Sequence, residues 1–209
     1  MTLGLSSPAG DEGHPGTLET FCTYRLIDPG ILSIHMTAET DSRTIVNFAH
    51  YSYFTLNYRQ SIGDHLLQID GRALHADGRR IDPIVSVTDT PFDFRRLRRI
   101  AEAGISYDIN FVLHHAQAGL HRAARLLPPN GGIALEVYTT EPGLQFYDGG
   151  YLKASHPGLD GCPHFPHAGL CLEPGRFPDG PNHPNFPSPV QRPGEVYRQT
   201  TEYRFVNAD

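Results

Sequence analysis

Tryptophan is absent from the sequence, and cysteine is rare: only Cys22, Cys162 and Cys171 occur among 209 residues. A small, odd number of cysteines argues against a disulfide framework, so we expect free thiols in a reducing compartment. No apolar run approaches the roughly 20 residues of a membrane-spanning helix, and residues 1–16 lack the apolar core of a signal peptide. These absences predict a cytoplasmic protein without a membrane partner.

Charge is also scarce. Charged residues make up 19% of the chain, and 17 Lys and Arg residues stand against 23 Asp and Glu residues, for a formal net charge of -6. The chain therefore has little excess positive charge with which to bind a phosphate backbone, so we expect no nucleic acid partner. The 39% hydrophobic content can supply a core, and the length suits a single domain over residues 1–209.

Glycine (21), proline (18), tyrosine (10) and phenylalanine (11) are abundant instead, which is typical of turn-rich β proteins. Apolar and polar residues alternate over 18–26 and 32–38, with Asp28-Pro29-Gly30 between them, which predicts a β-hairpin. Further strands are expected at 44–49, 65–69, 84–87, 107–113, 119–126, 133–139, 169–173 and 197–205. About ten short strands without a long helix predict an all-β fold, a large antiparallel β-sandwich.

Two segments depart from the strand pattern. Residues 94–103 have a helical pattern with four arginines, which we interpret as a solvated helical turn and not as a basic binding patch. Residues 174–193 contain seven prolines, typical either of a polyproline ligand or of a long ordered loop. Phe177 and Phe186 interrupt the prolines and could anchor a loop, so we expect an ordered loop that walls a cleft.

A metal site is the weakest of the candidate sites. Cys162, His164, His167 and Cys171 have the ligand types of a structural zinc site, but their spacing matches no standard finger. Cys171 also lies in an apolar run, where a buried free thiol is the ordinary outcome. We therefore expect no metal, and keep a zinc-stabilised module only as a remote alternative.

Carboxylates and aromatics are better candidates for a site. Glu173 follows the apolar residues 168–172 and precedes the proline-rich loop, as either a general base or an exposed strand terminus. Asp108 lies inside an aromatic strand, where it either supports the structure or accepts hydrogen bonds from a ligand. Residues 47–54 combine imidazole, hydroxyls and rings, which suits either the lining of a sugar site or an aromatic core strand.

Several segments together resemble the galactose mutarotase (aldose 1-epimerase) family, and they recur in order along nearly the whole chain. They are GDEGHPG at 10–16, VNFAHYSYF at 46–54, TPFDFR at 90–95, YDINF at 107–111, LEVYTTEPGLQFY at 135–147, CLE at 171–173, FPD at 177–179 and PNHPNFP at 181–187. The resemblance implies a large antiparallel β-sandwich with a sugar cleft. It also implies interconversion of the α and β anomers of a free hexose such as galactose or glucose, without a cofactor.

The resemblance assigns roles residue by residue. Glu173 matches the catalytic base, Asp108 a carboxylate that binds sugar hydroxyls, and Gln145 a polar cleft residue. Tyr51 stands at the position of the acid histidine, and His50 is one place earlier, on the opposite face of an extended segment. A phenol with a pKa of about 10 is a poorer acid than an imidazole of about 6.5, so a non-catalytic carbohydrate-binding relative is the alternative function.

The resemblance begins well inside the family's fold. Upstream strands, with an arginine and another histidine that line the family's cleft, have no match in this sequence. Pro174-Gly175 also replaces the usual Thr-Gln after the base. We therefore expect a sandwich that is incomplete at its N-terminus and has an uncovered apolar surface.

Overall fold

The computed structural model describes residues 1–27, 29–57, 61–74, 85–114, 119–153, 157–158, 161 and 163–208. Nearly all regular structure in these residues is β, which confirms the predicted fold class. The strands are β1 (Thr2–Ser7), β2 (Leu18–Ile27), β3 (Ile31–Thr40), β4 (Thr44–Ile45), β5 (Tyr53–Phe54), β6 (Leu66–Ile69), β7 (Gly71–Leu74), β8 (Arg98–Arg99), β9 (Asp108–Leu113), β10 (His121–Leu127), β11 (Gly132–Thr139), β12 (Gly143–Tyr147), β13 (Leu170–Gly175), β14 (Val190–Gln191) and β15 (Tyr197–Ala208). Short 3-10 helices are η1 (Asp11–Gly13), η2 (Ile62–Asp64), η3 (Ile100–Ala103) and η4 (Gly180–Asn182). In this part of the chain, no helix has the length and apolar character needed to cross a lipid bilayer.

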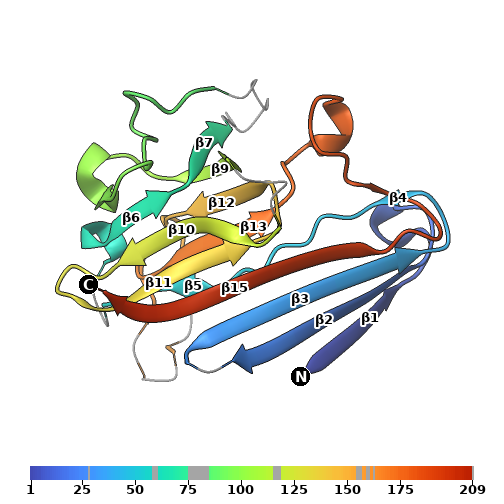
Figure 1. The fold of residues 1–209 in the computed structure, drawn as a ribbon, viewed down its shortest axis with the longest axis horizontal. Coiled ribbons are helices and arrows are strands. Elements are labelled where there is room, and N and C mark those ends of the chain that lie inside the picture. Colours follow the sequence, from blue (N-terminus) through green and yellow to red (C-terminus); the bar gives the residue numbers. More distant parts are fainter. Residues whose placement is uncertain are drawn as a thin grey trace.

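Two antiparallel sheets account for most strands (Figure 1). The larger has the order β1-β2-β3-β15-β11-β10-β6-β8, and the smaller has the order β5-β13-β12-β9-β7. Strands β14 and β4 form a separate pair. The predicted hairpin is β2 and β3, which pair from Leu18 with Thr40 to Ile27 with Ile31.

The two sheets share one hydrophobic core, as expected for a sandwich. The larger sheet contributes Ile34, Leu67, Leu126, Leu135 and Tyr203, and the smaller contributes Ile109, Phe111, Leu144, Phe146, Leu170 and Leu172. Phe94 is fully buried among aromatic rings, with centroids 5.2 Å from Tyr107 and 5.6 Å from Phe146. Since residues two apart on a strand share a face, the core residues of β13 and β12 place the intervening side chains on the outer face of the smaller sheet.

Two predicted strands need correction, and one observed strand was not predicted. The strand expected at 44–49 is only Thr44–Ile45, which pairs with β14. Val46 still donates to the carbonyl of Pro189, which directly precedes β14, but a proline has no N–H with which to continue the pairing. Of the strand expected at 84–87, residue 84 lies outside the described residues and 85–87 are not in a strand. Strand β1, which no pattern predicted, pairs with β2 along its whole length.

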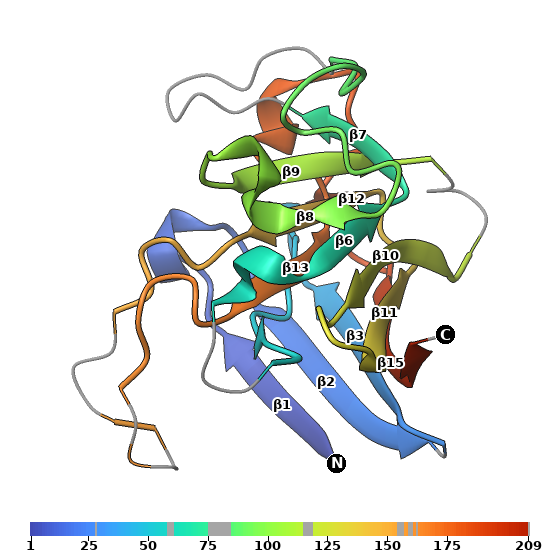
Figure 2. The same cartoon turned by 90° about the vertical axis from the view of Figure 1, so that its left-hand side faces the viewer.

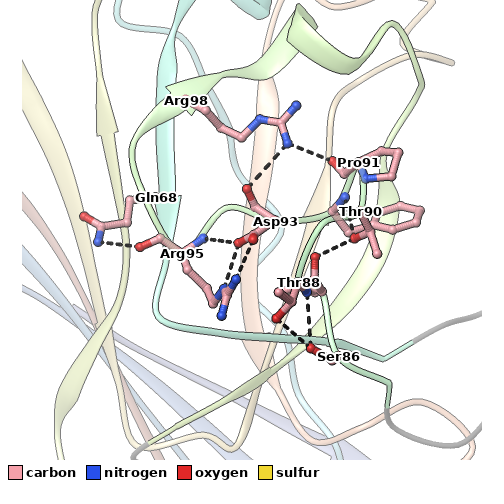
Figure 3. Close-up of polar contacts among 10 residues, drawn as sticks. Gln68, Ser86, Thr88, Thr90, Pro91, Asp93, Arg95 and Arg98 are labelled. Carbon is pink, nitrogen blue, oxygen red and sulfur yellow. Dashed lines mark hydrogen bonds and ion pairs between the residues drawn. The ribbon is translucent and has the colours of Figure 1, made fainter.

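The helical turn expected within 94–103 is shorter than its pattern suggests. Burial of Phe94 and pairing of Arg98 and Arg99 with β6 leave only the 3-10 helix Ile100–Ala103. Figure 3 shows how the arginines are used: Arg95 binds both carboxylate oxygens of Asp93, at 2.9 and 2.6 Å. Arg98 donates to the carbonyls of Pro91 and Asp93 at 3.4 and 3.5 Å. These two arginines brace a loop.

The proline-rich segment is an ordered loop, as predicted. Phe177 and Phe186 are buried, with ring centroids 5.3 Å apart and planes at 88°, and they pack against Val112. Val112 lies on the outer face of β9, two residues after Asn110. The loop that carries η4 therefore covers one end of the outer face of the smaller sheet.

The inner face of the larger sheet is not fully covered. Strand β1 lies at the free edge of that sheet (Figure 2), and its Leu3 and Leu5 face the same side as Cys22 of β2. Leu3, Leu5 and Leu26 are 53%, 68% and 84% exposed. The predicted uncovered apolar surface is therefore present at the β1 edge.

We expect this surface to cause self-association, because exposed apolar side chains on an edge strand favour contact between chains. Sedimentation velocity over a range of concentrations should show association of the wild-type chain and a monomer for a Leu3→Glu, Leu5→Glu variant. Ile133→Glu is the matched control, since Ile133 is 57% exposed on a different strand. A wild-type chain that stays monomeric throughout would contradict this prediction.

A carboxyl group is buried at the turn between β11 and β12. Glu141 is 4% exposed, and its Oε2 has no hydrogen-bond partner among the described residues. Burial raises its pKa to about 7, while Arg176 acts in the opposite direction. The folded chain therefore holds this proton more tightly than the unfolded chain, and the carboxyl reduces stability as the pH rises from about 4.5 through 7.

Glu141→Gln should remove this pH dependence. At about pH 8 the free energy of unfolding of the variant should exceed that of the wild type by on the order of 3 kcal/mol, and the difference should shrink at about pH 4. Urea denaturation at both pH values measures the effect. Glu12→Gln, at an exposed residue, is the control. An equal difference between Glu141→Gln and wild type at both pH values would show that the carboxyl does not titrate as described.

Candidate active site

The outer face of the smaller sheet brings the predicted site residues together. Pairing sets Glu173 of β13 opposite Gln145 of β12, and Gln145 opposite Asn110 of β9. Directly opposed residues share a face. The neighbouring row across the same face contains Tyr53, Cys171, Tyr147 and Asp108.

Glu173 is buried although it lies on this outer face. It is 8% exposed, and its Oε1 has no hydrogen-bond partner among the described residues. Strand β13 continues through Pro174 to Gly175, so the alternative of an exposed strand terminus is wrong. Burial raises the pKa of Glu173 to about 7, and the charge of Asp108 adds to the shift. The carboxyl is thus poised to exchange a proton near neutral pH.

Asp108 is held beside this carboxyl by Gln145. The Nε2 of Gln145 donates to Oδ1 of Asp108 at 2.7 Å. Asp108 is exposed, so its remaining acceptor sites are open to a ligand. Gln145 is the direct neighbour of both carboxylates, one by strand pairing and one by this hydrogen bond.

The segment 50–54 alternates between the two faces of the smaller sheet. Tyr51 and Tyr53 turn outward, with ring centroids 5.5 Å apart and a hydrogen bond of 3.4 Å from the Tyr53 hydroxyl to that of Tyr51. Tyr51 is 57% exposed. Burial of its hydroxyl, the hydrogen bond from Tyr53 and the nearby Cys171 and Glu173 all raise its pKa, so the phenol stays protonated.

His50 turns inward instead. Its ring lies between Tyr24 of β2 and Tyr203 of β15, at centroid distances of 5.9 and 5.4 Å. Burial lowers its pKa, which keeps the imidazole neutral near pH 7. The lining of a site and an aromatic core strand, the two alternatives for residues 47–54, are therefore both present in this segment. Tyr51 and Tyr53 line the outer face, while His50 and Phe54 pack in the core.

Cys171 lies on the outer face between Tyr53 and Tyr147. It is buried, and burial together with the charge of Glu173 raises the pKa of its thiol to about 12. Of the other residues in the zinc candidate, Cys162 lies outside the described residues, and His167 places its Nδ1 3.1 Å from the carbonyl oxygen of Asp148. Cys171 therefore lies on the Glu173 face, whereas the His167 ring contacts the backbone of Asp148.

Sequence reasoning did not single out Tyr147, which completes the aromatic row. Its ring centroid lies 6.2 Å from that of Tyr53, and its hydroxyl accepts a hydrogen bond from the amide of Tyr151 at 2.8 Å. The sequence pattern could have indicated Tyr147, because it follows Gln145 by two residues in the strand and so shares its face. Rings beside carboxylates form a surface that can contact both the C–H groups and the hydroxyls of a sugar.

A model of the family described as aldose 1-epimerase matches residues 1–204. The chain belongs to the aldose 1-epimerase family. Galactose mutarotase from Mus musculus is 38% identical over 212 residues, which cover 95% of this chain and 60% of the mouse protein. Aldose 1-epimerase from Escherichia coli is 37% identical over 221 residues, which cover 99% of this chain and 64% of the bacterial protein.

Solved structures agree with this family membership. The GalM/aldose epimerase homologue from C. elegans superposes with a TM-score of 0.92 at 25% identity, and the match covers 100% of this chain and 66% of that one. Galactose 1-epimerase from Lactobacillus acidophilus has a TM-score of 0.79 at 24% identity, with 100% and 63% covered. The chain spans about 60% of the length of the mouse mutarotase. The resemblance stated from the sequence motifs is confirmed.

We expect Asp108→Asn to lower the pKa of Glu173, because the charge of Asp108 contributes to raising it. Carboxyl ¹³C NMR titration of the full chain measures the pKa of each glutamate. Glu141 serves as an internal control, since burial alone raises its pKa. An unchanged Glu173 titration in Asp108→Asn would show that the two carboxylates do not interact.

Proposed function

We propose that this chain is an aldose 1-epimerase that interconverts the α and β anomers of a free hexose. The observation that supports this proposal most directly is the buried Glu173, with an unpartnered Oε1 and a pKa raised to about 7, on the same face as Asp108. The names of the curated relatives, galactose mutarotase and aldose 1-epimerase, support the same reaction.

The proposed reaction needs two proton transfers and no cofactor. Glu173 removes the proton from the anomeric hydroxyl, an acid protonates the ring oxygen, and the C1–O5 bond breaks to give the open-chain aldehyde. Rotation about C1–C2 presents the other face of the aldehyde. The ring then closes as the acid recovers its proton from O5 and Glu173 returns its proton to O1.

Asp108 and Gln145 are proposed to orient the sugar. The carboxylate accepts hydrogen bonds from hydroxyls and the amide can donate to them, and charge-assisted bonds of this kind are the stronger ones. Because Gln145 already binds Asp108, the pair presents a fixed pattern of acceptors beside the base. Orientation of this kind lowers the entropic cost of reaching the reactive geometry.

Tyr51 is the proposed acid, because it stands at the position that the resemblance gives to the acid histidine and because it lies on the Glu173 face as a protonated phenol. Its raised pKa makes it a reliable donor but a weak acid, so proton transfer to the ring oxygen gains less than from a histidine. The neutral His50 faces the core. This arrangement also favours the alternative function, a carbohydrate-binding relative that has lost efficient acid catalysis.

Two finer features belong to the same proposal. The substrate is a free aldose, because the site offers carboxylate, amide and phenol groups and no cluster of cationic side chains on the described part of the Glu173 face. The location is the cytoplasm, supported by the free thiols of Cys22 and Cys171.

Polarimetry on freshly dissolved α-D-galactose tests the proposal. The wild-type chain should accelerate mutarotation weakly, and Glu173→Gln should abolish the acceleration. The rate should fall tenfold per pH unit below about pH 7, because Glu173 must be ionised to act as a base. Tyr51→His should raise the rate, within the roughly 10²- to 10⁴-fold range of general acid catalysis.

Glu141→Gln is the control for that experiment, since Glu141 lies outside the site and should not affect the rate or the acid limb. Robust catalysis that survives Tyr51→Phe would contradict the assignment of Tyr51 as the acid. Saturable binding of galactose by NMR titration, without any acceleration that depends on Glu173, would favour the carbohydrate-binding alternative.

A further inference from the structure

A line of hydrogen bonds crosses the core directly beneath the Glu173 face. The hydroxyl of the fully buried Tyr203 donates to the carbonyl of Leu172 at 3.1 Å. The same hydroxyl lies 3.3 Å from Nδ1 of His50. The hydroxyl of Ser52 lies 3.4 Å from Nε2 of that imidazole. One tyrosine of the larger sheet thus contacts both β13 and the segment before β5 in the smaller sheet.

The donor and acceptor in each of these hydrogen bonds follow from the Leu172 carbonyl, which can only accept. Because the Tyr203 proton is given to the Leu172 carbonyl, its oxygen is left to accept, and Nδ1 of His50 must carry the proton. Nε2 is then an acceptor, which matches the position of the Ser52 hydroxyl. His50 therefore has no proton to spare for a substrate.

The two attachment points lie next to the proposed reacting groups. Leu172 directly precedes Glu173, and His50 directly precedes Tyr51. The ladder between β5 and β13 consists of only two pairs, Phe54 with Leu170 and Tyr53 with Cys171. Beyond the second pair, the carbonyl of Leu172 accepts the hydrogen bond from the Tyr203 hydroxyl. This hydroxyl therefore binds the β13 backbone at the point where the pairing with β5 stops.

We infer that Tyr203 is a positioning residue, whose hydroxyl holds the backbone of the Glu173 strand at a fixed place relative to the Tyr51 segment. The inference rests on the proposed function for its catalytic consequence. Its ring is well suited to this role because it is packed against Phe54, at a centroid distance of 4.9 Å, and against His50. Small displacements of reacting groups are costly, up to about 10²-fold for roughly 1 Å.

Kinetics of Tyr203→Phe in the full chain test the inference. The change removes only the hydroxyl, so the ring packing stays. We expect kcat for galactose mutarotation to fall by about tenfold to 10²-fold while KM changes little, because binding groups remain and alignment is lost. Tyr138→Phe is the control: Tyr138 lies on the neighbouring strand β11 of the larger sheet and donates to Glu136 Oε2 at 3.3 Å, so loss of its hydroxyl should leave kcat unchanged.

Variants of His50 separate positioning from general stability. Asn can place an amide N–H near the position of Nδ1–H, so His50→Asn should retain most of kcat, whereas His50→Leu should reproduce the loss in Tyr203→Phe. If the hydroxyl and the imidazole act as a unit, the Tyr203→Phe, His50→Leu double variant should be no slower than either single variant. A kcat within twofold of wild type for Tyr203→Phe, or fully additive losses, would overturn the inference.

¹⁵N NMR of the imidazole distinguishes failure of this inference from failure of the proposed function. The wild type should show His50 protonated at Nδ1, and Tyr203→Phe should lose that preference. A wild-type chain without mutarotase activity would overturn the proposed function, while the Nδ1–H tautomer and its loss in Tyr203→Phe would still support the tether. A His50 protonated at Nε2 in the wild type would overturn the tether itself.

Discussion

Burial of β13 on both faces is the constraint on which the site depends. The inner side chains Leu170 and Leu172 belong to the common core, while Cys171 and Glu173 are buried on the outer face. A carboxylate in such a strand loses hydration, and Asp108 adds a like charge nearby. The resulting pKa near neutrality is therefore a product of sheet packing, and it is the property that a general base needs.

The segment before β5 also alternates between the two faces of the smaller sheet, and its residues differ in role accordingly. Adjacent residues point to opposite sides, so Tyr51 reaches the Glu173 face and His50 reaches the core. His50 then serves the structure, between Tyr24 and Tyr203, and Tyr203 extends from the larger sheet to the backbone of β13. Through these contacts the larger sheet supports the geometry of a site that lies on the smaller one.

The outer face is bounded by elements far from it in sequence. The proline-rich loop is pinned by Phe177 and Phe186 against Val112 at one end, and Tyr51 and Tyr53 stand at the other. Gly143 allows this close packing, since a Cβ there would lie 2.9 Å from the carbonyl oxygen of Gly175 and 3.0 Å from the ring of Phe177. By contrast, the β1 edge of the larger sheet leaves Leu3 and Leu5 exposed on its inner face. The chain is thus closely packed around Glu173 and open at its edge.

The sequence by itself determined the all-β class, the β2–β3 hairpin, the ordered proline-rich loop and the family. Alternation, turn residues and anchoring aromatics are local signals, and motif order needs no coordinates. It also indicated Glu173, Asp108, Gln145 and Tyr51. Only the tertiary structure decided that Glu173 is buried with a raised pKa, that Gln145 lies opposite it and binds Asp108, and that Tyr203 contacts Leu172 and His50. Those properties come from residues far apart in the chain that meet through strand register and sheet packing, which local patterns do not encode. The helical turn expected within 94–103 is confined to its last four residues for the same reason, because burial of Phe94 and pairing with β6 outweighed local helical preference.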